Sequence, residues 1–220
     1  MRKLIAALAV GMAVTGGSVA SAQNPEDALT VTLHVTNRAA ISPKDLAAAE
    51  AYATAIYRAA GIQAVWTETP WAPGETRSPH LRVVILSPQM TAKRCKESQL
   101  GESVMGIAVD GVTDGSGRIA YIFADRIGQM AWQYLATFDR GLGHAMAHEV
   151  GHLLLGAHSH APAGLMTAHW YPLETHLQTL TPEQVQVIRV RATATGSMSR
   201  AGTNSEGTLP LARCCQATDR

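Results

Sequence analysis

Residues 148–152 read His-Glu-Val-Gly-His, and their spacing constrains the fold more tightly than any other feature of the chain. The two histidines are four positions apart, so they project from one face of an α-helix, about one turn from each other. Val150, Leu153 and Leu154 supply apolar side chains that can pack this helix against a core. We therefore predict a long helical region that follows a strand ending at Ala124 and runs to about Leu155.

Histidines at this spacing can bind a single metal ion. Two imidazoles one turn apart can both ligate zinc at about 2.0 to 2.1 Å. Glu149 lies beside the first histidine, where its carboxylate can reach a zinc-bound water, take its proton and later deliver it to a leaving amine. The same pattern also occurs by chance in core helices, but the further histidines that follow favour a real site. We therefore predict a Zn²⁺ site with His148 and His152 as ligands and Glu149 as general base.

A catalytic zinc ion usually has three protein ligands and one open position. Gly156 can end the helix and turn the chain back toward the metal. His158 and His160 come soon after this glycine, and either could supply the third ligand. His144, one turn before His148, is more simply explained as a histidine on the helix surface.

The sequence before this region predicts strands and one helix. Alternating apolar and polar residues over 29–36 indicate a half-buried strand in which His34 faces solvent. Ser42 and Pro43 are typical of a helix start, and Gly61 of a helix end. Further strands are expected at about 63–67, 81–86, 104–109 and 118–124, with a loop over 70–79.

Two other segments predict irregular structure: 88–103, which is polar, and 156–180. A last helix is expected from residue 181, because residues 181–184 (Thr-Pro-Glu-Gln) have the spacing of a capping box and Val185 and Ile188 can form a buried face. The order is strand, helix, four strands, helix, loop and helix. This order predicts an α/β class, with the helices packed on one five-stranded sheet in a single compact domain.

In its histidines and in its order of elements, the chain resembles the metzincins, whose signature is HExxHxxGxxH followed by a turn that contains methionine. Met166, within Gly-Leu-Met at 164–166, has the position of this Met-turn, and His158 has the spacing of the third histidine. The resemblance covers about residues 29–193. It implies a metzincin-like catalytic domain, α/β (α+β) in class, with a five-stranded mixed sheet, an active-site helix and a C-terminal helix.

The same resemblance implies a zinc metalloendopeptidase, a hydrolase that cleaves peptide bonds in a peptide or protein substrate. Some metzincins place an oxyanion-stabilising tyrosine just after the Met-turn, and Tyr171 is the candidate here, although it lies farther along. In the family, the substrate pairs with an edge strand above the zinc, and the order of strands assigns that edge to Gly106–Val109. A zinc-containing binding module and a hydrolase of another amide are the alternatives.

One departure from the signature bears on the third ligand. The family glycine is expected at position 155, where this chain has Leu155, and Gly156 comes one place later. The chain is also similar to small secreted bacterial proteins that carry HELGHLLLG followed by an HSPxGIM-like stretch. The histidine of that stretch corresponds to His160, which we therefore favour over His158 as the third ligand.

The N-terminal residues have the order of a secretory signal peptide. Arg2 and Lys3 precede an apolar run over 4–14, and small residues lead to Ala22. The run is well short of the roughly 20 residues that span a bilayer. We predict cleavage after Ala22 and a secreted or periplasmic chain without a membrane span. Its parts are a signal peptide (1–22), one peptidase domain (23–195) and a disordered tail (196–220).

Charge and cysteine content add two constraints. Without Arg2 and Lys3 the chain has 16 basic and 17 acidic residues, a formal net charge of −1, and no basic stripe, so a nucleic-acid partner is not expected. The three cysteines have no zinc-motif spacing. Cys95 is expected in a loop, from which it can form a disulfide with Cys214 or Cys215 in an oxidising compartment.

Overall fold

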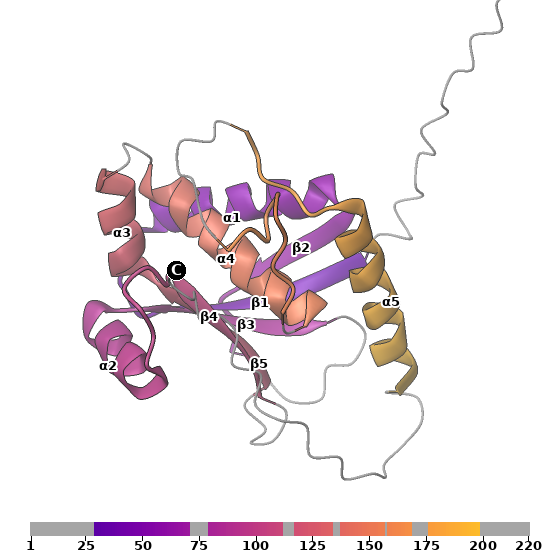
Figure 1. Cartoon of the computed structure of the whole chain (residues 1–220), viewed down its shortest axis with the longest axis horizontal. Helices are drawn as coiled ribbons and strands as arrows, with labels where there is room; N and C mark the ends of the chain where they lie inside the picture. Colours follow the sequence, from indigo (N-terminus) through magenta and orange to yellow (C-terminus); the bar gives the residue numbers. More distant parts are fainter. Residues whose placement is uncertain are drawn as a thin grey trace, which may run out of the picture.

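Ten elements make up the computed structural model, which describes residues 29–70, 79–111, 117–133, 137–156, 158–168 and 176–198 (Figure 1). The described part contains five strands and five helices, and it confirms the predicted α/β class. In chain order these are β1 (Leu29–Asn37), α1 (Pro43–Ala59), β2 (Ile62–Thr67), β3 (His80–Leu86), α2 (Pro88–Ser98), β4 (Gly106–Gly111), β5 (Gly117–Phe123), α3 (Ala124–Gln133), α4 (Phe138–Leu155) and α5 (Pro182–Met198).

The five strands form one mixed sheet in the order β2-β1-β3-β5-β4. The three pairings among β2, β1, β3 and β5 are parallel, whereas β4 pairs with β5 in the antiparallel direction, with Ala108 opposite Ala120. Within the described residues, β2 and β4 are therefore the two edges. The mixed sheet agrees with the prediction.

Alternation along β3 divides the core into two parts. Leu81, Val83 and Ile85 belong to the larger cluster, which includes the buried residues of α1 and α4. Val84 and Leu86 point to the other face, where they join a smaller cluster that contains Cys95 of α2. Figure 1 accordingly shows α1 and α4 together on one side of the sheet and α2 on the other.

Helices α1 and α4 lie close together because one glycine lets their backbones approach. A Cβ on Gly143 of α4 would stand 2.5 Å from the carbonyl oxygen of Ala49 on α1. Nearer the end of α1, the hydroxyl of Tyr57 donates a 2.7 Å hydrogen bond to the carbonyl of Ala147. The start of α1 is as predicted: Ser42 accepts from the Asp45 amide, and proline occupies the first turn.

The prediction of an irregular segment at 88–103 is wrong, because residues 88–98 form α2. Ser87 caps its first turn by accepting from the Met90 amide, and the helix ends at Gln99, which has left-handed backbone geometry. A left-handed residue that is not glycine gives no clear stop signal. Only Thr91 and Cys95 are buried, so the helix also lacks a wide apolar stripe. Cys95 accordingly lies on a helix, not in the loop that the sequence predicted.

Two further expectations need correction. The helical region predicted over 124–155 is two helices, because α3 ends at Gln133 and α4 begins after Thr137, whose backbone is extended.

His34 does not face open solvent, because its residue is only 7% exposed. Its Nδ1–H donates to the Thr69 carbonyl at 2.8 Å, and its Nε2 lies 2.9 Å from Nδ1 of His80.

Some predictions fall on residues outside the described ranges: the signal peptide, most of the loop at 70–79, and the pairing of Cys214 and Cys215. Helix α5 continues to Met198, three residues beyond the predicted domain end, and the rest of the predicted tail is not described. None of the helices in the described part is long and apolar enough to cross a bilayer.

Substitution Gly143→Ala should destabilise the protein. Overpacking against a backbone oxygen costs up to about 3 kcal/mol, whereas replacing a helix glycine by alanine gains about 1 kcal/mol. We therefore expect urea denaturation to show a net loss of about 2 kcal/mol. Gly101→Ala is the matched control, because its new Cβ would meet nothing within 4 Å. Equal stability of the two variants would contradict the close α1–α4 contact.

Candidate metal centre

Three histidine nitrogens converge at the C-terminal half of α4. Nε2 of His152 lies 3.1 Å from Nε2 of His148 and 3.1 Å from Nε2 of His160. The ligand atoms of the three residues all lie within 4.8 Å of one another, so the group could hold a metal ion. His148 and His152 are each 3% exposed, whereas His160 is exposed, which leaves one side of the group open.

Hydrogen bonds at the far side of two rings aim their Nε2 atoms at the centre. Nδ1–H of His148 donates to the carbonyl of Leu165 at 2.8 Å, and Nδ1 of His152 lies 2.8 Å from Oγ of Ser159. A carbonyl only accepts, so the proton of neutral His148 is on Nδ1 and its Nε2 carries a lone pair. Hydrogen-bond partners of this kind, at the ring nitrogen that does not bind the metal, fix the ring orientation of metal-binding histidines.

The charge state of His148 suits a cation. Burial, together with the neighbouring His152, lowers the pKa of His148 to about 3, so this ring is neutral near pH 7. Lone pairs that face each other at 3.1 Å repel unless a cation or a proton lies between them. A tetrahedral ion with bonds of about 2.0 to 2.1 Å separates its ligand nitrogens by about 3.3 Å, close to the spacing here.

A tight turn after α4 brings the third histidine back to the helix. Gly156 ends α4 with φ of +97°, and its amide donates to the His152 carbonyl at 2.8 Å. This backbone conformation requires glycine, whereas a Cβ would displace only the guanidinium of Arg191 on α5, whose Nη1 would stand 2.7 Å away. His158 also has positive φ (+58°), and the chain then reverses toward His160.

The fully buried Met166 lies directly against the back of α4. A Cβ on Gly151, which stands between the two helix histidines, would be only 2.5 Å from the Met166 sulfur. The methionine is held in a turn in which the amide and hydroxyl of Thr167 donate to the Gly164 carbonyl. The same segment provides the Leu165 carbonyl that orients His148.

Glu149 lies on the same turn of α4 but contacts the sheet. The residue is 2% exposed, and its Cγ would be 2.7 Å from a Cβ on Gly106, the first residue of β4. The carbonyl of Tyr121 would be 2.8 Å from the same Cβ. Gly106 therefore leaves the space that the Glu149 side chain occupies, and this contact places a buried carboxylate beside the histidine group.

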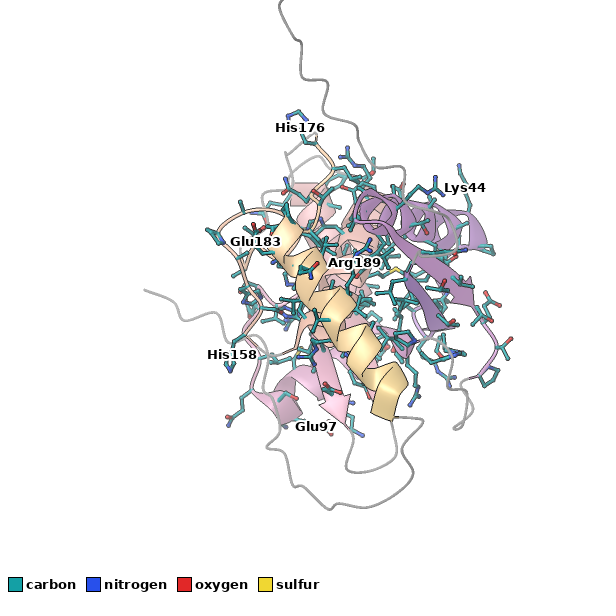
Figure 2. The ribbon with its side chains drawn as sticks, turned by 90° about the vertical axis from the view of Figure 1, so that its right-hand side faces the viewer. Lys44, Glu97, His158, His176, Glu183 and Arg189 are labelled. Carbon is teal, nitrogen blue, oxygen red and sulfur yellow. The ribbon has the colours of Figure 1, made fainter. Side chains whose placement is uncertain are left out.

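The structure brings His160, not His158, to the histidines of α4. The exposed side chain of His158 points away from the body of the protein in Figure 2. His144 is not part of the group, but its ring stacks on His148 with centroids 6.5 Å apart, and burial lowers its pKa to about 4. It is partly buried rather than on the open helix surface. Tyr171 lies outside the described residues.

The sequence did not predict that three residues, Ser159, Gly106 and Tyr57, would contact the helix that carries this centre or its ligands. Ser159 stands between the two candidate ligands His158 and His160, so its position was a usable signal for a partner of His152. Gly106 and Tyr57 gave no such signal, because their contacts with α4 join residues far apart in the chain.

Ser159→Ala should weaken metal binding without unfolding the protein. The change removes the group that orients His152, and losing such a partner typically costs about 10- to 100-fold in metal affinity. Competition for Zn²⁺ with a chromophoric chelator would measure the change. His158→Ala is the control and should leave the affinity unaltered. The reverse result would mean that His158, not His160, completes the centre.

No family model matches the sequence of this chain, and no curated protein matches it either. What the centre does must therefore be inferred from its own residues: three converging imidazoles, one buried carboxylate and an edge strand beside them.

Proposed function

We propose that this protein is a zinc-dependent metallopeptidase of metzincin type that hydrolyses peptide bonds. One observation carries the proposal: Nε2 atoms of His148, His152 and His160 converge, and the residue after the first of them is a buried glutamate. Three protein ligands with one open position are the usual protein contribution to a catalytic zinc centre.

The donor set fits zinc, for which imidazole is a preferred ligand. His148, His152 and His160 would hold the ion, with the exposed side of His160 toward solvent. When bound there, zinc supplies Lewis acidity, which polarises a carbonyl group and lowers the pKa of water. The proton transfers of the reaction require side chains of the protein.

Glu149 has the position of the general base. Its carboxylate is held on the same turn as His148, between α4 and the start of β4. In the proposed reaction it accepts a proton from the attacking water and then donates that proton to the departing amine nitrogen.

The edge strand β4 suits an extended peptide as substrate. In the described part of the chain β4 has one sheet neighbour, β5, and it begins at Gly106 next to Glu149. A peptide that adds to the outer edge of a strand gains main-chain hydrogen bonds along its length. Such pairing would carry a peptide bond past the open side of the histidine group.

Two features support the metzincin type in particular. Met166 lies in a turn beneath the helix histidines, and, apart from α2, the strand and helix order over 29–193 resembles that of the family's catalytic domain. We also propose that the protein is exported, on the basic, apolar and small-residue order of residues 2–22.

Glu149→Gln should abolish peptide cleavage while zinc remains bound. The amide keeps the size of the side chain but cannot accept the proton, and general base catalysis contributes about 10²- to 10⁴-fold to a rate. Zinc content by atomic emission and cleavage of casein and of a mixed peptide library are the measurements. Glu97→Gln is the matched control, because Glu97 is an exposed carboxylate on α2 (Figure 2).

The outcomes separate the alternatives. If the unaltered protein binds zinc but cleaves no peptide in the library, it is a binding module or acts on another amide. If it binds no zinc, the proposed function is wrong altogether. Equal activity of Glu149→Gln and Glu97→Gln would remove Glu149 from the reaction.

Gly106→Ala tests the placement of the carboxylate. The added methyl would overlap Cγ of Glu149 and the carbonyl of Tyr121, so the glutamate must move. A displacement of about 1 Å can reduce a catalytic rate by about 10²-fold. We expect kcat to fall by about that factor, with zinc content unchanged. Gly101→Ala should be neutral, and an unaltered kcat in Gly106→Ala would show that the glutamate does not depend on this contact.

A further inference from the structure

Tyr57 of α1 is a buried phenol that contacts α4. It lies near the end of α1, is 1% exposed and is among the largest fully buried side chains. Its hydroxyl donates a 2.7 Å hydrogen bond to the carbonyl of Ala147, the residue directly before His148. The bond links two residues that are 90 positions apart.

The hydroxyl of Tyr57 contributes an interaction that filling the space does not require. Burying it requires removing its water, whereas phenylalanine would fill the same space at no such cost. Within the helix, the Ala147 carbonyl also accepts the hydrogen bond from the Gly151 amide. The phenol is therefore a second donor to the same carbonyl oxygen. Its effect is therefore to fix the position of this peptide group relative to α1.

Helix α4 depends on contacts of this kind. Gly141, Gly143 and Gly151 lower its intrinsic stability, each by about 1 kcal/mol relative to alanine. Thr137 at its N-terminus makes no side-chain hydrogen bond to the first turn. A helix with this composition is positioned by its neighbours, and Tyr57 contacts the turn that carries both His148 and Glu149.

Tyr57 is also electrostatically close to Glu149. Burial raises the pKa of the phenol well above its usual value, and the charge of Glu149 raises it further, so the hydroxyl keeps its proton and remains a donor. Glu149 thus lies beside Gly106 of β4 and within electrostatic range of Tyr57.

We propose that Tyr57 is a positioning residue that sets the place of the His148–Glu149 turn relative to α1 through its bond to the Ala147 carbonyl. This inference rests on the proposed peptidase function. The phenol does not touch substrate or metal; it acts through Ala147 on the two residues that follow. Its loss should therefore alter the catalytic rate and the geometry of the centre, while substrate and metal still bind.

Tyr57→Phe removes only the hydroxyl. We expect it to fold, to bind the same amount of Zn²⁺ and to keep KM, with kcat lower by about tenfold, since small displacements of catalytic groups reduce rates strongly. Replacing zinc by Co²⁺ gives a second measurement, because the visible spectrum of Co²⁺ reports ligand geometry without any turnover. We expect the Co²⁺ bands of Tyr57→Phe to shift from those of the unaltered protein.

Tyr52→Phe is the matched control. Tyr52 lies on the same helix and stacks under Arg140 of α4 through its ring, which phenylalanine retains. It should keep both kcat and the Co²⁺ spectrum. A Tyr57→Phe protein with unaltered Co²⁺ bands would overturn the proposal, as would a lower stability with unaltered kcat, which is what a purely structural hydrogen bond predicts.

Two further results are informative. If the unaltered protein cleaves no peptide, the proposed function fails, but the Co²⁺ comparison still decides the role of Tyr57. If Tyr57→Phe does not fold, fluorotyrosine placed at position 57 keeps the phenol and changes its strength as a donor. A shift of the Co²⁺ bands in that protein supports the proposal, and identical bands overturn it.

Discussion

Helix α4 is packed so closely against its neighbours that glycine is required on three sides of it, and the candidate metal centre depends on this packing. Gly143 admits the backbone of α1, Gly151 admits the sulfur of Met166, and Gly106 of β4 admits Glu149. A methyl group at any of the three would have to displace backbone or buried atoms. Because protein interiors are packed as densely as organic crystals, such contacts fix the rotation of the helix about its axis and its distance from the neighbouring elements. The direction of its histidines follows from that placement.

The histidine group, in turn, combines two different kinds of support. His148 is held by a main-chain carbonyl from the methionine turn, and His152 by a serine from the segment just after the helix. The first support is independent of side-chain identity, whereas the second is a single hydroxyl. Glu149 is enclosed by the space that Gly106 of β4 leaves beside the helix.

Local signals explain what the sequence could predict. The strand at β1, the start of α1 at Ser42 and the helix that carries His148 and His152 each follow from periodicity or capping within a few residues. Helix α2 was missed because it buries few apolar residues and ends at Gln99 rather than at glycine. The burial of His34 depends on His80 and Thr69, which are distant in the chain, so alternation alone assigned the histidine to solvent. Long-range contacts leave no periodic trace in a sequence.

The turn between α4 and His160 is short, and this has a consequence for how a bound ion relates to folding. An ion shared by His152 and His160 closes a loop of only eight residues, and the entropy of closing so short a loop is small. Most of the chain's conformational entropy is lost when the sheet and helices pack, independently of the ion. The ion is therefore a local cross-link: it fastens the segment around His160 to a helix that the glycine contacts already hold.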